Sequence, residues 1–162
     1  ERLGLVADIL KDQDVRLGLE YVGPRTLQAR GKYSFVRTMK ENKELITAIN
    51  RPNVGFVLDS FHWYCAGEAK EDLLTLTNDD IVAVDLNDAR SGYTADEQID
   101  GKRELPSATG VIDLKAFLEA LIEIGYDGPI RSEPFNQPLR DMNDHDALEA
   151  NYRAMKKSFD LV

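Results

Sequence analysis

Four apolar runs in this chain each end in an acidic residue. The runs span residues 15–20, 54–59, 81–85 and 129–133, and the acids that close them are Glu20, Asp59, Asp85 and Glu133. Short, continuously apolar runs followed by helical patterns are typical of buried parallel strands. Since the carboxyl ends of parallel strands lie at one rim of a sheet, we expect the four carboxylates to face a common site.

Four carboxylates at one site would repel one another, and their pKa values would rise unless a cation compensates them. The sequence therefore predicts a divalent-metal site. Oxygen ligands favour Mg²⁺ or Mn²⁺, whereas a histidine ligand would also admit Zn²⁺ or Co²⁺. The alternative is that the acids cap the helices that follow, or pair with arginines such as Arg16, Arg90 and Arg131.

A histidine follows the second acid at a short spacing. Asp59 ends its run and His62 lies three residues later, in a segment expected to be a loop over the rim. Both side chains can therefore face one pocket, with Trp63 as an apolar wall. Such a pair is weak evidence alone, because a single histidine is more often a surface or capping residue. The acids on the neighbouring strands strengthen it.

Helical patterns separate the four runs. They cover residues 35–49, 68–76, 114–124 and about 146 to the end, with Asp113 as a predicted N-cap and Gly125 as a C-terminal stop. The polar stretch 89–110 is too long for an ordinary connection and is predicted to act as a lid or to be disordered. Apolar strands that alternate with helices indicate an α/β fold with a parallel sheet covered by helices.

Four strand–helix units make up half of a (β/α)8 barrel. We therefore expect residues 1–162 to form one domain that corresponds to the C-terminal half of such a barrel. An isolated four-stranded sheet would leave its edge strands unpaired. The chain also begins at Glu1, in what reads as the end of a helix. An N-terminal half-barrel or a second copy in a homo-oligomer is the expected partner that closes the barrel.

The composition limits the partners and the compartment. The chain has 162 residues and a formal charge of −9, which argues against binding a nucleic-acid backbone. One cysteine excludes an internal disulfide framework and fits a reducing compartment. We see neither an apolar run long enough for a membrane span nor a signal peptide. These features predict a cytoplasmic protein that binds neither nucleic acid nor a membrane.

Several ordered motifs resemble one known family. They lie at residues 18–24, 55–63, 84–89, 100–106 and 125–135, so that the similarity covers nearly the whole chain. Together they resemble the C-terminal half of the xylose isomerase-like TIM barrels. That superfamily includes sugar phosphate isomerases/epimerases, ketose 3-epimerases, hydroxypyruvate isomerase and inosose dehydratase. The motifs are specific for the superfamily but do not choose among its members.

The resemblance implies a role for each matching residue. Glu20 and Glu133 would be metal ligands and the two catalytic acid/bases, and Asp59 would be a further ligand. His62 would hydrogen-bond a substrate oxygen, and Arg103 would hold a substrate oxygen near the metal. The implied function is a metal-dependent isomerase or epimerase of a small sugar or polyol derivative.

One position departs from the family pattern. The third-strand ligand is usually a histidine in a Val-His-x-x-Asp context, and here that position is Asp85. Asp85 could complete an all-oxygen site, or it could mark weakened metal binding. The family's Pro-Gly-x-Gly turn after the arginine also differs, since residues 106–110 read Pro-Ser-Ala-Thr-Gly.

The expected chemistry proceeds through an enediolate. One glutamate removes a proton from the carbon next to a carbonyl, and the other returns a proton to the opposite face or to the neighbouring carbon. An inosose-type dehydratase that loses a β-hydroxyl, or a non-catalytic barrel module, is the alternative. The related endonuclease for abasic DNA is disfavoured, because its metal cluster needs more histidines than His62 and His145.

Overall fold

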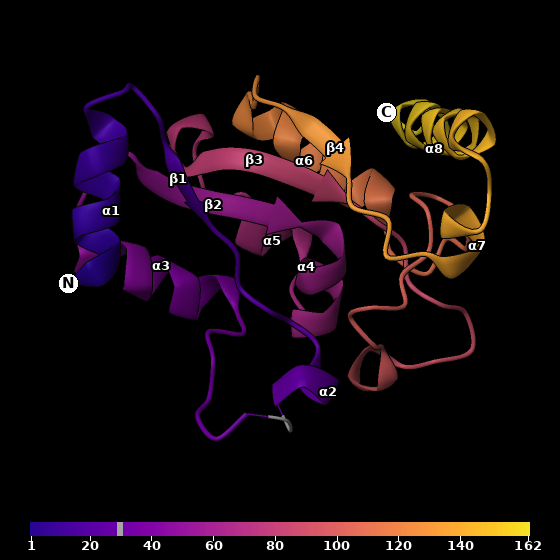
Figure 1. Ribbon diagram of the computed structural model, residues 1–162, viewed down its shortest axis with the longest axis horizontal. Coiled ribbons are helices and arrows are strands. Elements are labelled where there is room, and N and C mark those ends of the chain that lie inside the picture. Colours follow the sequence, from indigo (N-terminus) through magenta and orange to yellow (C-terminus); the bar gives the residue numbers. More distant parts are fainter. Residues whose placement is uncertain (29–30) are drawn as a thin grey trace.

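A parallel sheet of four strands forms the centre of the molecule (Figure 1). The computed structural model describes residues 1–28 and 31–162. Strand order follows the chain, so every strand lies beside its sequence neighbour. The strands are β1 (Leu17–Leu19), β2 (Val54–Asp59), β3 (Ile81–Leu86) and β4 (Ile130–Ser132). The predicted α/β architecture is confirmed, and this strand order is that of a section of a barrel.

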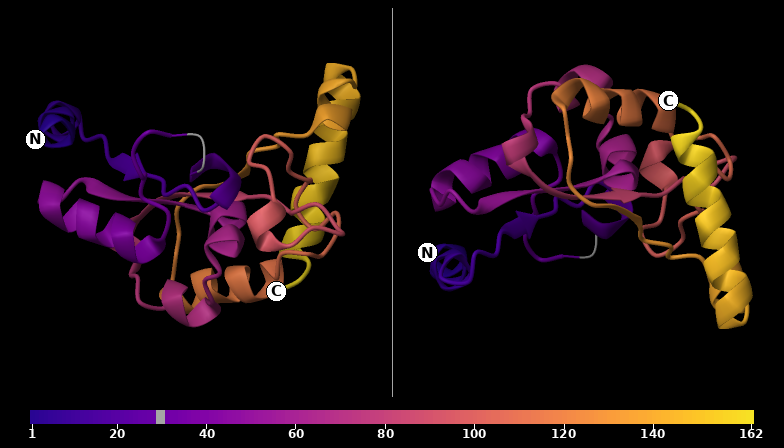
Figure 2. Two further views of the ribbon diagram at one scale, coloured as in Figure 1. Left: turned by 90° about the horizontal axis from the view of Figure 1, so that it is seen from below. Right: turned by 90° about the horizontal axis from the view of Figure 1, so that it is seen from above.

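Helices connect the strands and cover one face of the sheet. They are α1 (Arg2–Lys11), α2 (Arg25–Gln28), α3 (Met39–Ile49), α4 (Ser60–Ala66), α5 (Lys70–Leu73), α6 (Leu114–Ile124), α7 (Gln137–Arg140) and α8 (Asp144–Phe159), with 3₁₀ turns η1 (Asn78–Asp80) and η2 (Ala95–Glu97). Helices α1 and α8 lie at opposite ends of the molecule (Figures 1 and 2). Among the described residues, no helix has both the length and the apolar character that crossing a bilayer requires.

Local capping fixes most of the predicted helix ends. Helix α6 has the predicted bounds, because the Asp113 side chain accepts from the Ala116 N–H (3.0 Å) and Gly125 adopts a left-handed φ of 73°. Helix α3 begins four residues later than predicted. Thr38 and Glu41 form a capping box there, in which each side chain accepts from the other residue's backbone N–H.

The segment after β2 differs from the prediction. A short loop was expected, but α4 starts directly at Ser60, and Asp59 is its N-cap through a 2.7 Å bond from the Phe61 N–H. His62 therefore lies on a helix, which fixes its direction more firmly than a loop would. The helix predicted over residues 68–76 is shorter and corresponds to α5.

The two faces of the sheet have different roles. Apolar side chains from one face pack with Met39 of α3, Leu73 of α5 and Phe117 of α6, and they include Phe56, Leu58, Val84 and Leu86. The register aligns Asp59 with Asp85 and Asp85 with Arg131 on neighbouring strands. Because side chains alternate along each strand, these polar residues belong to the other face, at the carboxyl ends of the strands.

Candidate metal and acid–base site

Carboxylates from two strand ends meet a histidine at the rim of the sheet. Glu20 follows β1, Asp59 ends β2 and His62 lies in the first turn of α4. One potential ligand atom from each of these residues lies within 4.8 Å of the others. The structure therefore brings the strand-end acids Glu20 and Asp59 together.

A buried arginine joins Glu133 to this group. Arg103 Nη1 donates to Asp59 Oδ2 at 2.6 Å and to Glu133 Oε2 at 3.0 Å, and Nη2 donates to Asp100 Oδ1 at 2.7 Å. Its guanidinium lies over the rings of Phe61 (4.9 Å) and Phe135 (4.7 Å). Arg103 therefore compensates the carboxylates at the ends of β2 and β4 together.

Residues 89–110 form an ordered loop that carries Arg103 back to the sheet. Its base is closed by Asp88, whose carboxylate accepts from the backbone N–H groups of Thr109 (2.8 Å), Gly110 (2.7 Å) and Ile112 (3.0 Å). An antiparallel bridge also pairs Asp88 with Glu104. A compact loop with joined ends, rather than a disordered one, positions the arginine.

Two polar residues of the site were missed by sequence reasoning. Asn87 Nδ2 donates to both oxygens of Asp59, at 3.2 and 3.1 Å. Asp100, which reads as a solvated loop acid, instead pairs with Arg103. Asp100 lies three residues before Arg103, and this spacing was the signal in the sequence for their ion pair. Nothing in the sequence near Asn87 indicated that its side chain would face Asp59.

Glu20 is the least compensated acid of the site. Its Oε1 atom is buried and has no hydrogen-bond partner among residues 1–28 and 31–162. Burial, followed by repulsion from Asp59 and Glu133, raises the pKa of Glu20 to about 8. A buried carboxylate oxygen without a donor, next to other carboxylates, is the environment that a bound cation would relieve.

Replacing Glu20 with Gln is expected to stabilise the metal-free chain at pH 8 by on the order of 2 kcal/mol, because the amide removes the cost of holding this ionisable carboxyl among other acids. Partial exposure of the side chain screens part of that cost, which keeps the expected gain below the full value of the pKa shift. The unfolded chain ionises this carboxyl near the ordinary pKa of 4.5, whereas the folded chain holds its proton up to about pH 8. The stability that Glu20 contributes is therefore complete below pH 4.5 and is lost as the pH rises to 8.

Denaturant unfolding at pH 5 and pH 8, with EDTA present, tests this pH dependence. The Glu20→Gln variant should lose less stability over this interval than the unchanged chain. Glu44→Gln, at an exposed position of α3, is the matched control and should leave the loss unchanged. An equal loss in the Glu20→Gln variant would assign the pH dependence to other groups.

Both ring nitrogens of His62 lie opposite hydrogen-bond donors. The Gly23 N–H donates to Nδ1 at 3.3 Å, and Arg103 Nη2, which can only donate, lies 3.3 Å from Nε2. Burial lowers the pKa of His62, which favours the neutral ring. Nε2 lies 3.9 Å from Glu20 Oε2 and 3.8 Å from Asp100 Oδ1. Nε2 thus faces both the acids of the site and the Arg103 guanidinium.

Gly23 has a steric reason to be glycine. A Cβ atom at this position would lie 2.3 Å from the backbone oxygen of His62. The chain after β1 can therefore approach α4 closely enough for its N–H group to reach the imidazole ring.

Asp85 is engaged by an arginine. It lies beside Asp59 in the sheet, but Arg131 on β4 holds its carboxylate with two bonds, Nε to Oδ1 at 2.5 Å and Nη2 to Oδ2 at 3.0 Å. The pairing with Arg131 is the alternative that the sequence had left open. Any ligation by Asp85 would have to break or share this bidentate ion pair.

Trp63 lies away from Glu20, Asp59 and Glu133, which we call the acidic cluster. Its ring packs edge to face against Phe117 with centroids 5.4 Å apart, and its Nε1 donates to the Ala69 carbonyl at 3.2 Å. The structure therefore places Trp63 in the core under the helices. The predicted residues that it brings together are Glu20, Asp59, His62, Arg103 and Glu133.

Comparisons with known proteins identify the family. The family model described as "Xylose isomerase-like TIM barrel" matches residues 1–158. The inosose isomerase of Bacillus subtilis (strain 168) is 31% identical over 160 residues, which cover 97% of this chain and 52% of that protein. The chain thus spans about half the length of the curated relatives it matches.

Solved structures give the same result. A xylose isomerase domain protein from Alicyclobacillus acidocaldarius aligns with a TM-score of 0.88 and 35% identity over 99% of this chain and 56% of its own. The IOLI protein, solved with a bound zinc atom, aligns with a TM-score of 0.83 and 28% identity over 96% of this chain and 53% of its own. The resemblance seen in the sequence is confirmed, and the chain belongs to the xylose isomerase-like TIM barrel family.

Proposed function

We propose that this chain carries the metal and acid–base site of an isomerase or epimerase that acts on a small sugar or polyol derivative. The observation that supports it most is the meeting of Glu20, Asp59 and His62 within 4.8 Å, where Arg103 joins Glu133 to the group and Glu20 Oε1 has no partner among the described residues. The similarity to an inosose isomerase supports the same class of substrate.

The donor set fits a divalent cation. Carboxylate oxygens of Glu20, Asp59 and Glu133 would hold it, which favours Mn²⁺ or Mg²⁺. Zinc and cobalt stay as alternatives, and the zinc atom in the IOLI structure supports considering them. When bound, such a cation would stabilise the negative charge that develops on an enediolate.

Proton transfer is the role that this proposal gives to the two glutamates. Glu20 follows β1 and Glu133 follows β4, so they enter the site from strands at opposite ends of the sheet. Burial raises the pKa of both, and Arg103 opposes this rise at Glu133. A carboxylate with a pKa closer to neutrality is a stronger base. We assign proton removal and proton return to this pair.

His62 and Arg103 supply donors for substrate oxygens. His62 Nε2 lies 3.9 Å from Glu20 Oε2, and the Arg103 guanidinium bridges Asp59 and Glu133. Proton return to the opposite face of the same carbon gives epimerisation, and return to the neighbouring carbon gives isomerisation. Loss of a β-hydroxyl gives the dehydratase alternative.

A second candidate is a barrel module without catalytic activity. The specific observation in its favour is the Asp85–Arg131 ion pair, which occupies the position where the family usually has a histidine ligand. This reading predicts no metal ion at the acidic cluster.

Metal titration separates the two candidates. We expect Mn²⁺ to bind with a saturable signal in electron paramagnetic resonance and to raise the melting temperature. Glu20→Gln and Glu133→Gln should each weaken this binding at least about tenfold, because each removes a charged ligand. Glu44→Gln is the control and should bind as the unchanged chain does. Absence of binding at millimolar Mn²⁺ would favour the module without activity.

A further inference from the structure

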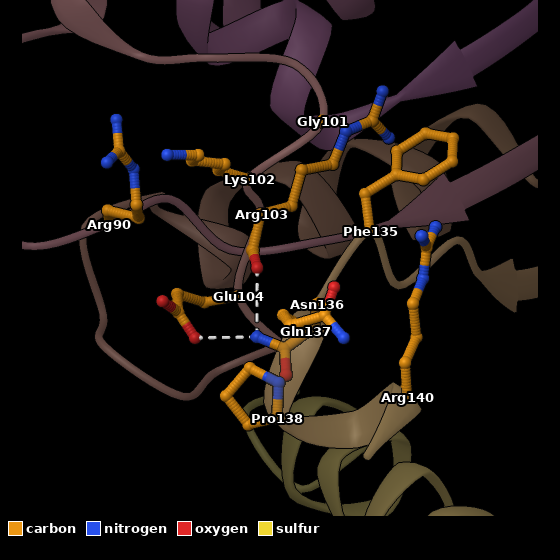
Figure 3. Close-up of a pocket in the computed structure, with 10 residues that line it drawn as sticks. All are labelled: Arg90, Gly101, Lys102, Arg103, Glu104, Phe135, Asn136, Gln137, Pro138 and Arg140. Carbon is orange, nitrogen blue, oxygen red and sulfur yellow. Dashed lines mark hydrogen bonds between the residues drawn. The ribbon is translucent and has the colours of Figure 1, made fainter.

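A cavity of about 430 Å³ lies between the Arg103 loop and the segment that follows β4 (Figure 3). Arg103 lines this cavity, while its guanidinium contacts Asp59 and Glu133. The cavity and the acid–base site are therefore neighbours that share one side chain. Its volume is in the range of small-molecule sites.

Positive charge is concentrated in this cavity. Arg90, Lys102 and Arg140 line it, and Glu104 is its acidic residue, so three positive charges less one negative leave an excess of two. Arg103 adds little to this excess, because its charge is taken up by the carboxylates described above. The whole chain carries a formal charge of −9, so a cationic cavity is contrary to its overall composition.

The cations of the cavity lack protein acceptors. Two guanidinium nitrogens of Arg90, Nε and Nη2, are buried and have no hydrogen-bond partner within the described part of the chain. Over the same residues, neither Lys102 nor Arg140 forms an ion pair with an acidic side chain. A buried donor left unpaired is costly, and a ligand oxyanion would supply the missing acceptors.

Aromatic rings hold the two arginines in place. The Arg90 guanidinium lies 4.0 Å from the centre of the Tyr93 ring, and that of Arg140 lies 6.0 Å from the Phe135 ring. In Figure 3, Lys102 extends toward Arg90, and Arg140 stands on the other side of the view. Glu104 is held by Asn136, whose Nδ2 donates to it at 3.0 Å. The two arginine donors are thus positioned before any ligand arrives.

We propose that this cavity binds an anionic group, a carboxylate or a phosphate ester, at one end of the substrate. The assignment to the substrate rests on the proposed function, because the acid–base site is next to the cavity. An arginine pair and a lysine are the usual partners of such oxyanions in proteins. The polyol carbons would then extend from the cavity toward Glu20 and Glu133.

Inorganic phosphate is the first probe, since it tests the cavity without any turnover. Titration should shift the backbone amide signals of residues 101–104 and 135–140 to saturation in nuclear magnetic resonance spectra. Arg140→Gln and Lys102→Gln change exposed side chains and should each weaken binding about tenfold. Lys40→Gln on α3 is the matched control and should leave affinity unchanged. Signals that shift across the whole surface, or equal affinity in all variants, would overturn the proposal.

A pair of ligands then tests the assignment to the substrate. A ketopentose and its terminal phosphate ester are titrated against the unchanged chain and against Arg140→Gln. The phosphate ester should bind at least about tenfold more tightly, and Arg140→Gln should remove most of that difference. If inorganic phosphate occupies the cavity but the two sugars bind equally, the anion is not part of the substrate. Loss of isomerase activity alone would leave the phosphate result standing, so that the two proposals fail separately.

Discussion

Glu133→Gln should lower turnover by about 10³-fold while the chain stays folded, within the range that one general acid/base usually contributes. The amide keeps the size of the side chain, and its carbonyl oxygen can still accept from Arg103 Nη1. It cannot take up or return a proton. Since 41% of the Glu133 side chain is exposed, the substitution leaves no buried group unpaired.

The measurement is kcat at saturating Mn²⁺, together with incorporation of solvent deuterium at the reacting carbon. Glu44→Gln controls for the loss of one negative charge and should keep full turnover. The circular dichroism spectrum of Glu133→Gln should match that of the unchanged chain. Retention of more than about a tenth of kcat would remove Glu133 from the acid–base chemistry, because that loss is below the usual contribution of such a group.

The strand ends could be predicted because the signal for them is local. A continuously apolar run that stops at an acid marks the end of a buried strand, and parallel pairing then places Glu20 and Asp59 at one rim. Both ends of helix α6 were predicted for a similar reason, since Asp113 begins the helix and Gly125 ends it through contacts within a few residues.

Contacts between distant parts of the chain could not be predicted in this way. The Asp85–Arg131 pair depends on the register of β3 against β4, which is fixed only when the strands associate. Arg103 reaches Asp59 only because the loop that carries it is closed by Asp88. The spacing of residues within a single motif predicts neither of these two contacts.

Helix α4 explains why Trp63 is not beside the cluster. Its sequence, Ser60–Ala66, is rich in aromatic residues and has little intrinsic preference for a helix, so a loop was the natural expectation. On a helix, successive side chains differ in direction by about 100°. Once His62 faces the acids, its neighbour must point elsewhere, and Trp63 enters the core against Phe117.

Arg103→Met should lower the free energy of unfolding by about 3–5 kcal/mol, the usual cost of removing one partner from a buried ion pair. Asp59 is fully buried and would keep its bonds from Asn87 and the Phe61 N–H, but it would lose its only cationic partner among the described residues. Glu133 would lose the same compensation. The loss should be larger at pH 8 than at pH 5, because burial raises the pKa of Glu20 and of Glu133, so that both carry more negative charge at the higher pH.

Arg25→Met is a matched control, because the Arg25–Asp96 pair has the same 2.6 Å separation as the pair of Arg103 with Asp59 but is mostly exposed. An exposed pair of this kind contributes about 0–1 kcal/mol, so the two variants separate the effect of burial from that of charge.

Denaturant unfolding with and without Mn²⁺ completes the comparison. If the acidic cluster binds a cation, Mn²⁺ should restore more stability to Arg103→Met than to Arg25→Met, because the ion takes over the compensation of Asp59 and Glu133. Equal losses in both variants would show that the neutral donors around Asp59 are sufficient, and that the arginine is present for the substrate rather than for the fold.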